Sequence, residues 1–376
     1  MALMGAALVA WWMLPSVTMA PNRIVPGTAY AASEVAGWGA AILASLPLAV
    51  AAWLARDLDR QRLKALLALV VVGLVGLPLW LTAASVQLVD PNLPQARIGI
   101  GAGLWLTLFM LLLALVELRT RLVLPSPVTW GVALLPLVVF VLCLPLGLDG
   151  LALWQEYAGR RDDFVAAIGE HLLLVGATVA ISLVVGAVIA LLMRRYPRVQ
   201  RLGFSLLNFL QTVPSLALFG LLLGPLAWLS DRYAWLDSLG VSGIGWAPAL
   251  IALVAYSLLP MVRNTFVALE GVDPGVVESA RGMGMSRLQS FLQVRLPLAL
   301  PVLLEGVRIT TVQAIGLTAV AALIGAGGLG RFIFQGLGQA AMDLVLLGAL
   351  PILLMAVVAD ALLGNLANRL RKGEPT

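Results

Sequence analysis

The chain has 376 residues, of which 61% are hydrophobic and only 11% are charged, and its mean hydropathy is +0.99. A water-soluble domain cannot bury so much apolar surface, whereas a lipid bilayer can surround it. A single cysteine, Cys143, excludes an intrachain disulfide, and a single histidine, His171, without a Cys/His cluster predicts no metal site. The formal net charge is +5, but the basic residues follow the ends of apolar runs, so we expect no nucleic-acid partner.

Apolar runs of about twenty residues recur along the chain and predict an all-α integral membrane protein with about ten transmembrane helices. The first run also has the length of a signal peptide, but it has no basic n-region, and Pro21 would follow its plausible cleavage site after Ala20. We therefore expect residues 1–20 to be retained as a helix. The expected spans are residues 3–20, 35–55, 65–86, 98–118, 128–148, 165–193, 203–229, 247–268, 298–324 and 344–367.

The basic residues predict the orientation of these spans. With a cytoplasmic N-terminus, the outer loops hold six basic residues, and Arg263 and Arg308 lie near helix ends or within spans. Because inner loops are enriched in Lys and Arg, this asymmetry places both termini in the cytoplasm. The sixteen basic residues of the inner loops are Arg56, Arg60, Arg62, Lys64, Arg119, Arg121, Arg194, Arg195, Arg198, Arg201, Arg281, Arg287, Arg295, Arg369, Arg371 and Lys372.

The polar landmarks divide the chain near residue 150. Residues 1–150 hold five runs with few distinctive polar residues, and residues 151–163 form a strongly charged outer connecting loop. Residues 164–370 form a core of five further spans, and residues 371–376 form a cytoplasmic tail. Within the core, residues 269–297 are a long polar insertion on the cytoplasmic side.

Local signals in residues 269–297 predict two short helices joined by a turn. Asp273 is a good N-cap, and Pro274 suits the first helical position, where its missing N–H costs nothing. The first helix should run to about Arg281 and end at Gly282 and Gly284, which allow a positive φ. Residues 286–289 then read as a capping box that opens the second helix, which Pro297 links to the next span.

The same segment carries a motif of the form E-x-A-x-x-x-G, followed after nine residues by V-x-L-P. This motif resembles the "EAA" loop of ABC-importer permeases, with Ser279 in place of the usual second alanine and Val294 in place of the usual isoleucine. The resemblance implies that a separate ATPase docks here and drives the membrane subunit. The residues that it assigns to ATPase coupling are Asp273, Pro274, Glu278, Ser279, Ala280, Arg281, Gly282, Gly284, Leu296 and Pro297.

Further segments, at 208–217, 256–264 and 323–330, narrow the resemblance to the glycine betaine/choline/proline-betaine (osmoprotectant) branch of these permeases. The resemblance covers about residues 164–370 and implies a type I ABC-importer transmembrane fold there. It also implies a dimer with a second permease copy or paralogue, an extracytoplasmic substrate-binding protein and a bacterial inner-membrane location. The first five runs look like an extra segment found in some members of that branch.

No nucleotide site is expected in this chain. A P-loop needs a lysine directly after a glycine, and neither Lys64 nor Lys372 has one. We therefore expect no bound cofactor, with ATP and Mg²⁺ held by the partner ATPase. The glycine cluster follows a membrane helix rather than a strand, so it predicts a structural turn formed by Gly325, Gly327, Gly328 and Gly330.

Polar residues within spans are costly in hydrocarbon and are candidates for a pathway or gate. The sequence around Pro214 fits either a gate or a kink whose carbonyls are satisfied by nearby hydroxyls. Glu305 and Arg308, three residues apart, are expected to neutralise each other, and Asp343 and Asp360 to cap or orient the last helix. The pathway or gate candidates are Asn208, Gln211, Thr212, Pro214, Ser215, Gln313 and Thr318.

Two other functional classes are alternatives to an importer subunit. Five plus five spans of odd parity would also suit the inverted repeat of a secondary transporter, but the two halves share no visible motif. A membrane-embedded enzyme would need a catalytic set, and His171 has no nucleophile or carboxylate at a recognisable spacing. Trp228, Trp235 and Trp246 could hold a quaternary ammonium, although tryptophan is expected at the outer membrane interface in any case.

Overall fold

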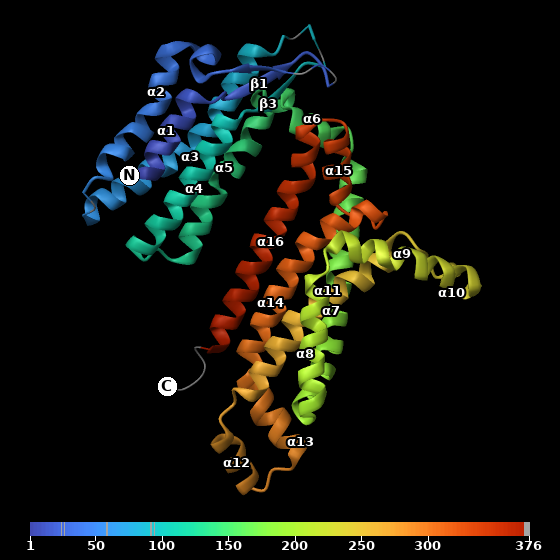
Figure 1. The fold of residues 1–376 in the computed structure, drawn as a ribbon. Coiled ribbons are helices and arrows are strands. Elements are labelled where there is room, and N and C mark those ends of the chain that lie inside the picture. Colours follow the sequence, from blue (N-terminus) through green and yellow to red (C-terminus); the bar gives the residue numbers. More distant parts are fainter. Residues whose placement is uncertain (24, 26, 58, 91, 94, 372–376) are drawn as a thin grey trace. The chain divides into compact units, whose positions relative to one another are not determined.

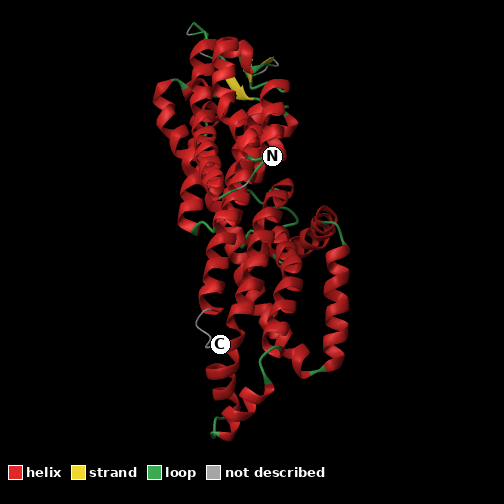
Figure 2. Ribbon diagram, turned by 90° about the vertical axis from the view of Figure 1, so that its left-hand side faces the viewer, coloured by secondary structure: helices red, strands yellow, loops and turns green. Residues whose placement is uncertain are grey.

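The computed structural model places most of the chain in helices, with one small sheet (Figures 1 and 2). Contacts divide it into two units, Met1–Gly159 and Arg160–Thr376, which we describe separately. The residues that the structure describes are 1–23, 25, 27–57, 59–90, 92–93 and 95–371. The expected tail at 371–376 therefore lies, apart from the backbone of Arg371, outside the described residues.

The first unit is a bundle of apolar helices closed at one end by a three-stranded antiparallel sheet of order β2-β1-β3 (Figure 1). Its core is lined by large side chains that are almost fully buried, among them Leu74, Leu111 and Leu115. Its elements are α1 (Ala2–Met13), β1 (Val17–Ala20), β2 (Thr28–Tyr30), α2 (Ala32–Leu54), α3 (Arg60–Leu88), β3 (Arg97–Ile100), α4 (Ala102–Leu122), α5 (Ser126–Cys143) and α6 (Ala152–Ala158).

The expectation that residues 3–20 form one spanning helix is wrong. Helix α1 has 12 residues, and Leu14 leaves it in an extended conformation (φ −110°, ψ 150°). Pro15 explains the ending, because the residue before a proline is pushed out of the helical region. The following residues, Val17–Ala20, pair with Thr28–Tyr30 and Arg97–Ile100, so the expected fourth span also loses its first residues to a strand.

The second unit is built around α7, α11, α14 and α16, which run side by side (Figure 1). Small residues let these helices approach closely. A Cβ added to Gly186 of α7 would lie 2.7 Å from Met261 of α11, and one added to Gly306 of α14 would lie 2.7 Å from Asn264 of α11. The elements are α7 (Arg161–Arg195), α8 (Pro197–Thr212), α9 (Ser215–Arg232), α10 (Ala234–Ser238), α11 (Trp246–Glu270), α12 (Pro274–Gly282), α13 (Arg287–Ser290), a π-helix (Phe291–Arg295), α14 (Leu296–Ala321), α15 (Gly330–Gly338) and α16 (Met342–Arg371).

Among the described residues, eight helices are long and apolar enough to cross a membrane, or up to nine if α8 and α9 count as one broken span. The tenth expected span is the first run, of which only the short α1 is helical. Residues 151–163, expected as a loop, hold α6 and the first turn of α7. Asp162 and Asp163 favour a helix start there, because carboxylates stabilise the positive end of the helix dipole.

Candidate functional site

Helix α12 is a short surface helix with one buried and one exposed face. The Asp273 carboxylate caps it by accepting a hydrogen bond from the backbone N–H of Gly275 at 2.7 Å, and Pro274 occupies its first position. Val277 and Ala280, three residues apart, are both buried, and Val277 packs in a cluster with Leu269, Val272 and Ala299. The exposed face carries Glu278, Ser279 and Arg281.

The turn after α12 depends on one glycine. Gly284 has φ +85°, and its N–H donates to the Arg281 carbonyl at 2.9 Å. Gly282, expected to share the break, instead remains the last residue of α12. The capping box is present, because the Gln289 N–H donates to the Ser286 hydroxyl at 3.2 Å and the Ser286 N–H donates to the Gln289 side chain at 2.8 Å.

The second short helix does not end before the next span. α13, the π-helix and α14 run on without a break, so that the helical stretch from Arg287 to Ile324 has 38 residues. Leu296 and Pro297 form the first turn of α14, directly after the π-helix. The segment 273–297 is therefore joined directly to a helix of the core.

The chain breaks sharply at Pro214. α8 and α9 meet there at 101°, with Val213 and Pro214 in extended conformations. Two contacts fasten the break to α11: the Gln211 side chain donates to the Tyr256 carbonyl at 2.7 Å, and the Tyr256 hydroxyl donates to the Val213 carbonyl. The bend predicted at this proline is confirmed, but the part played by Tyr256 was not foreseen.

The other pathway candidates differ in exposure. Asn208 is exposed on α8, and the Thr212 hydroxyl donates to the Phe209 carbonyl at 2.7 Å, so it satisfies a backbone group as the kink interpretation expects. Ser215 begins α9 and is half-buried, as is Gln313 on α14. Thr318 is fully buried on α14. Thr318 thus lies in the packed core of this chain rather than on an open surface.

The glycine cluster forms a turn at the start of α15, close to the first half of α7. Gly325, Gly327 and Gly328 have φ between +76° and +79°. The Gly328 N–H donates to the Glu170 carboxylate at 2.7 Å, and the His171 Nε2 lies 3.1 Å from the Ile315 carbonyl of α14. Sequence reasoning did not assign Glu170 or His171 to this turn, because nothing local relates positions 158 residues apart.

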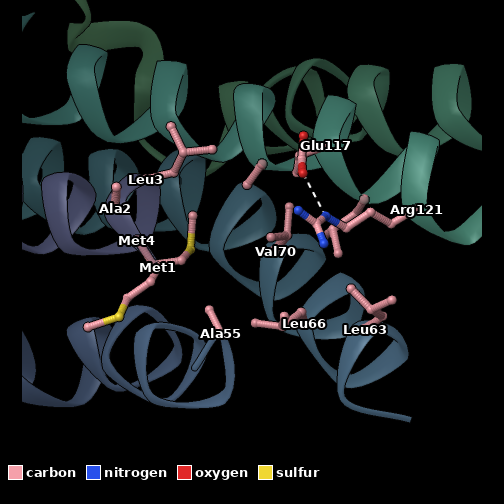
Figure 3. A pocket seen from close by; sticks show the side chains of 12 residues that line it. Met1, Ala2, Leu3, Met4, Ala55, Leu63, Leu66, Val70, Glu117 and Arg121 are labelled. Atoms are coloured by element: carbon pink, nitrogen blue, oxygen red, sulfur yellow. Dashed lines mark hydrogen bonds and ion pairs between the residues drawn. The ribbon is translucent and has the colours of Figure 1, made fainter. Parts of the chain in front are cut away.

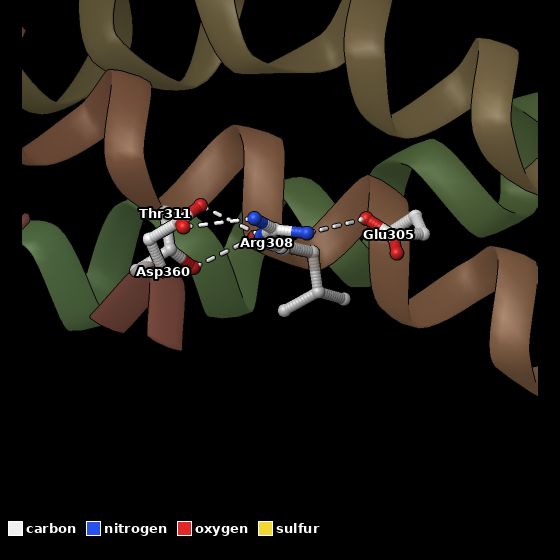
Figure 4. A network of polar contacts seen from close by, with 5 residues as sticks. Glu305, Arg308, Thr311 and Asp360 are labelled. Atoms are coloured by element: carbon white, nitrogen blue, oxygen red, sulfur yellow. Dashed lines mark hydrogen bonds and ion pairs between the residues drawn. The ribbon is translucent and has the colours of Figure 1, made fainter. Parts of the chain in front are cut away.

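A group of charged side chains joins α14 to α16 (Figure 4). The Arg308 guanidinium contacts both oxygens of Asp360, at 2.6 and 2.8 Å, and one oxygen of Glu305, at 3.3 Å. The predicted pairing of Glu305 with Arg308 is confirmed. Asp343 lies in the first turn of α16 as expected, whereas Asp360 lies deep in that helix and holds it to α14.

The first unit has a pocket of about 230 Å³ between the starts of α1 and α3 and the ends of α2 and α4 (Figure 3). Leu63, Leu66 and Val70 line it with apolar groups, and the Glu117–Arg121 ion pair lies at its edge at 2.6 Å. Apart from this ion pair, the side chains that line the pocket are apolar.

Comparison with known proteins gives this arrangement a family. Residues 182–372 match the model of the "Binding-protein-dependent transport system inner membrane component", and residues 1–154 match the "ABC transporter permease YehY, N-terminal domain". These two matches give no support to the five-plus-five inverted repeat of a secondary transporter.

Two curated relatives are similar over about half of the chain. The carnitine transport permease protein OpuCB of Listeria monocytogenes is 38% identical over 201 residues, which cover 54% of this chain and 85% of the relative. The osmoprotectant import permease protein OsmW of Salmonella typhimurium is 40% identical over 197 residues, which cover 52% and 86%. A solved chain of the MetNI methionine ABC transporter is 20% identical, with a TM-score of 0.48, over 55% of this chain and 95% of that one. The chain belongs to the family of binding-protein-dependent inner membrane components, the membrane-spanning permease subunits of ABC importers.

Proposed function

We propose that this chain is the permease subunit of an ATP-driven importer for osmoprotectants such as glycine betaine, choline and related quaternary amines. Its relatives are named as permeases for carnitine, choline or osmoprotectants, which supports this class of substrate. The working unit pairs it with a second permease copy or paralogue, an ABC ATPase in the cytoplasm and a substrate-binding protein outside. ATP and Mg²⁺ belong to the ATPase, and this chain supplies the pathway.

The observation that carries the proposal is the geometry of α12. Val277 packs it against the core and Ala280 is also buried, so its exposed face is presented in a fixed orientation. That face offers a carboxylate, Glu278, and a cation, Arg281, which suit charge-assisted contacts with a partner groove. A short exposed helix of this kind is a suitable docking element for a separate subunit.

The continuous helix Arg287–Ile324 links the docking segment 273–297 mechanically to the membrane core. Thirty-eight helical residues from Arg287 to Ile324 correspond to about 57 Å at 1.5 Å per residue. A displacement of α13 by the ATPase therefore acts on one end of a helix whose other end leads into the Gly325–Gly330 turn. The break between α8 and α9 contacts the neighbouring helix α11. We assign this break as the gate that the displacement of α13 and α14 operates.

The proposal is tested by recovery of the ATPase with purified variants. Glu278→Ala removes the exposed carboxylate, and Gly284→Ala places a Cβ at φ +85°. Gly338→Ala, in α15, is the matched control, because an added Cβ meets open space at Gly338 as it does at Gly284, but Gly338 has no positive φ. We expect Gly284→Ala and Glu278→Ala to lower ATPase recovery and betaine uptake while leaving membrane insertion unchanged.

The assay also includes Gly284→Asp, which adds a misplaced charge to the strained turn. We expect the largest loss of recovery with this variant. Normal ATPase recovery and normal binding-protein-dependent uptake with Gly284→Asp would contradict docking at α12. The substrate class is tested separately, by uptake of labelled glycine betaine, choline and carnitine into vesicles that hold the complete complex.

A further inference from the structure

Arg308 is a charged residue of α14, and its side chain connects α14 to α16. It forms a two-pronged contact with Asp360 of α16 and a longer contact with Glu305, one turn away on its own helix (Figure 4). A guanidinium and a carboxylate joined by two parallel hydrogen bonds make a strong and directional contact. Arg308 therefore holds α16 against α14 more firmly than it holds its neighbour Glu305.

The surface of α16 is shaped to receive this guanidinium. Gly364 lies four residues after Asp360, on the same face of the helix, and a Cβ added there would lie 3.2 Å from Cζ and Nη1 of Arg308. A larger residue would push the guanidinium away from the helix. The absence of a side chain at Gly364 thus lets Arg308 lie flat against the last helix.

Glu305 gives the cation a second partner that moves with it. If α16 separated from α14, the Arg308–Asp360 contact would break, and an unpaired cation at membrane depth is costly. Glu305 lowers that cost, because it lies on the same helix as Arg308 and stays beside it in either position. The Arg308, Glu305 and Asp360 side chains are 32%, 24% and 47% exposed, so they are not sealed in a rigid core.

We propose that Arg308 and Asp360 form a releasable latch between α14 and α16, with Glu305 as the partner that holds Arg308 when the latch is open. This inference rests on the proposed function, because α14 continues directly from the segment assigned to the ATPase. When α14 is displaced, Arg308 loses Asp360 but keeps Glu305, and α16 is released. The latch thereby keeps α16 closed until the ATPase moves α14.

The test uses the complete complex with its ATPase and binding protein in lipid vesicles, with ATP hydrolysis and betaine uptake measured together. Asp360→Asn weakens the closed latch, so we expect ATP hydrolysis without binding protein to rise. Uptake per ATP should fall by about fivefold or more, the lower end of typical couplings between linked sites. Asp360→Glu keeps the charge and should retain most of the coupling.

Glu305→Gln should act in the opposite direction. It removes the open-state partner and leaves the Arg308–Asp360 contact intact, so hydrolysis with binding protein should slow while uptake per ATP stays normal. Glu117→Gln is the matched control, because it makes the same change in a Glu–Arg pair within one helix of the first unit, and it should alter neither quantity.

The outcomes separate the latch from the proposed function. Equal effects of Asp360→Asn and Glu305→Gln, or unchanged uptake per ATP in Asp360→Asn, would overturn the latch. So would an Asp360→Asn chain that fails to reach the membrane where Asp360→Glu succeeds, because the pair would then serve folding alone. Failure of the unaltered chain to retain an ATPase would instead contradict the proposed function.

Discussion

Gly330 begins α15 at a place where the backbone of α14 leaves no room for a side chain. A Cβ built there would lie 1.9 Å from the Ala319 carbonyl oxygen. Gly338, the last residue of the same helix, has no atom within 4 Å of such a Cβ. Two glycines of one helix thus differ in their surroundings.

We expect Gly330→Ala to destabilise the second unit by about 1–3 kcal/mol, the usual cost of forcing extra atoms into a packed site. Gly338→Ala should leave stability unchanged within about 0.5 kcal/mol, as for a surface substitution. The midpoint of thermal unfolding in detergent measures both. Equal midpoints for the two variants would show that the backbones of α14 and α15 are not held so closely.

At this scale the sequence identified the residues whose roles depend on near neighbours. Asp273 and Ser286 were recognisable as helix caps, because a cap bonds to a backbone N–H two or three residues away. Glu170 was not recognisable, because its partner, Gly328, comes near only when α7 packs against the turn. For Gly325, Gly327 and Gly328 the sequence predicted a turn, but it did not predict that the Glu170 carboxylate accepts a hydrogen bond from that turn.

At the scale of elements, the break between α8 and α9 is held by more than its proline. Pro214 prevents one backbone hydrogen bond, but the Tyr256 hydroxyl bonds the Val213 carbonyl and Gln211 bonds the Tyr256 carbonyl. A Pro214→Ala variant would still have both contacts. Tyr256 is therefore the residue of α11 to which both contacts attach the break.

We expect Tyr256→Phe to lower betaine uptake while ATPase recovery stays normal, since it removes about 1 kcal/mol of hydrogen bonding from the break and nothing from α12. Hydrogen exchange of residues 209–216 should become faster. Tyr233→Phe, at an exposed position that ends α9, is the control and should change neither uptake nor exchange. Unchanged exchange in Tyr256→Phe would mean that Pro214 alone sets the bend.

Most spanning helices were predictable from the length of their apolar runs alone. Residues 165–193 and 344–367 fall within α7 and α16, as expected for long apolar runs that form spanning helices. Residues 3–20 have equal apolar content, yet they divide into a helix and a strand. Pro15 ends the helix, and the pairing of Val17–Ala20 with two distant strands then takes over. Such pairing depends on residues 97–100, which no local pattern connects to the N-terminus.

At the scale of the whole molecule, the basic residues predict which loops face the cytoplasm. Single cysteines at Arg60 and Arg198 should resist a membrane-impermeant thiol reagent in intact cells, while one at Asp237 should react. All three positions are exposed in the structure, so protection would report the membrane rather than burial. The unaltered chain is the control, because its Cys143 is buried. Labelling of Arg198→Cys from outside would reverse the predicted orientation.

The π-helix Phe291–Arg295 gives the base of α14 a property that a plain α-helix lacks. Its wider turn holds one residue more than an α-helical turn, with hydrogen bonds from each carbonyl to the fifth N–H ahead. Returning it to α-helical pairing would expel that residue and rotate the chain before it by about 100°, the angle between successive residues of an α-helix. Phe291, the first residue of the π-helix, packs against the buried cluster that contains Val277 of α12 and Ala299 of α14, and this packing opposes the rotation. The cluster thus holds the π-helix in its register, so that a displacement of α13 is passed on to α14.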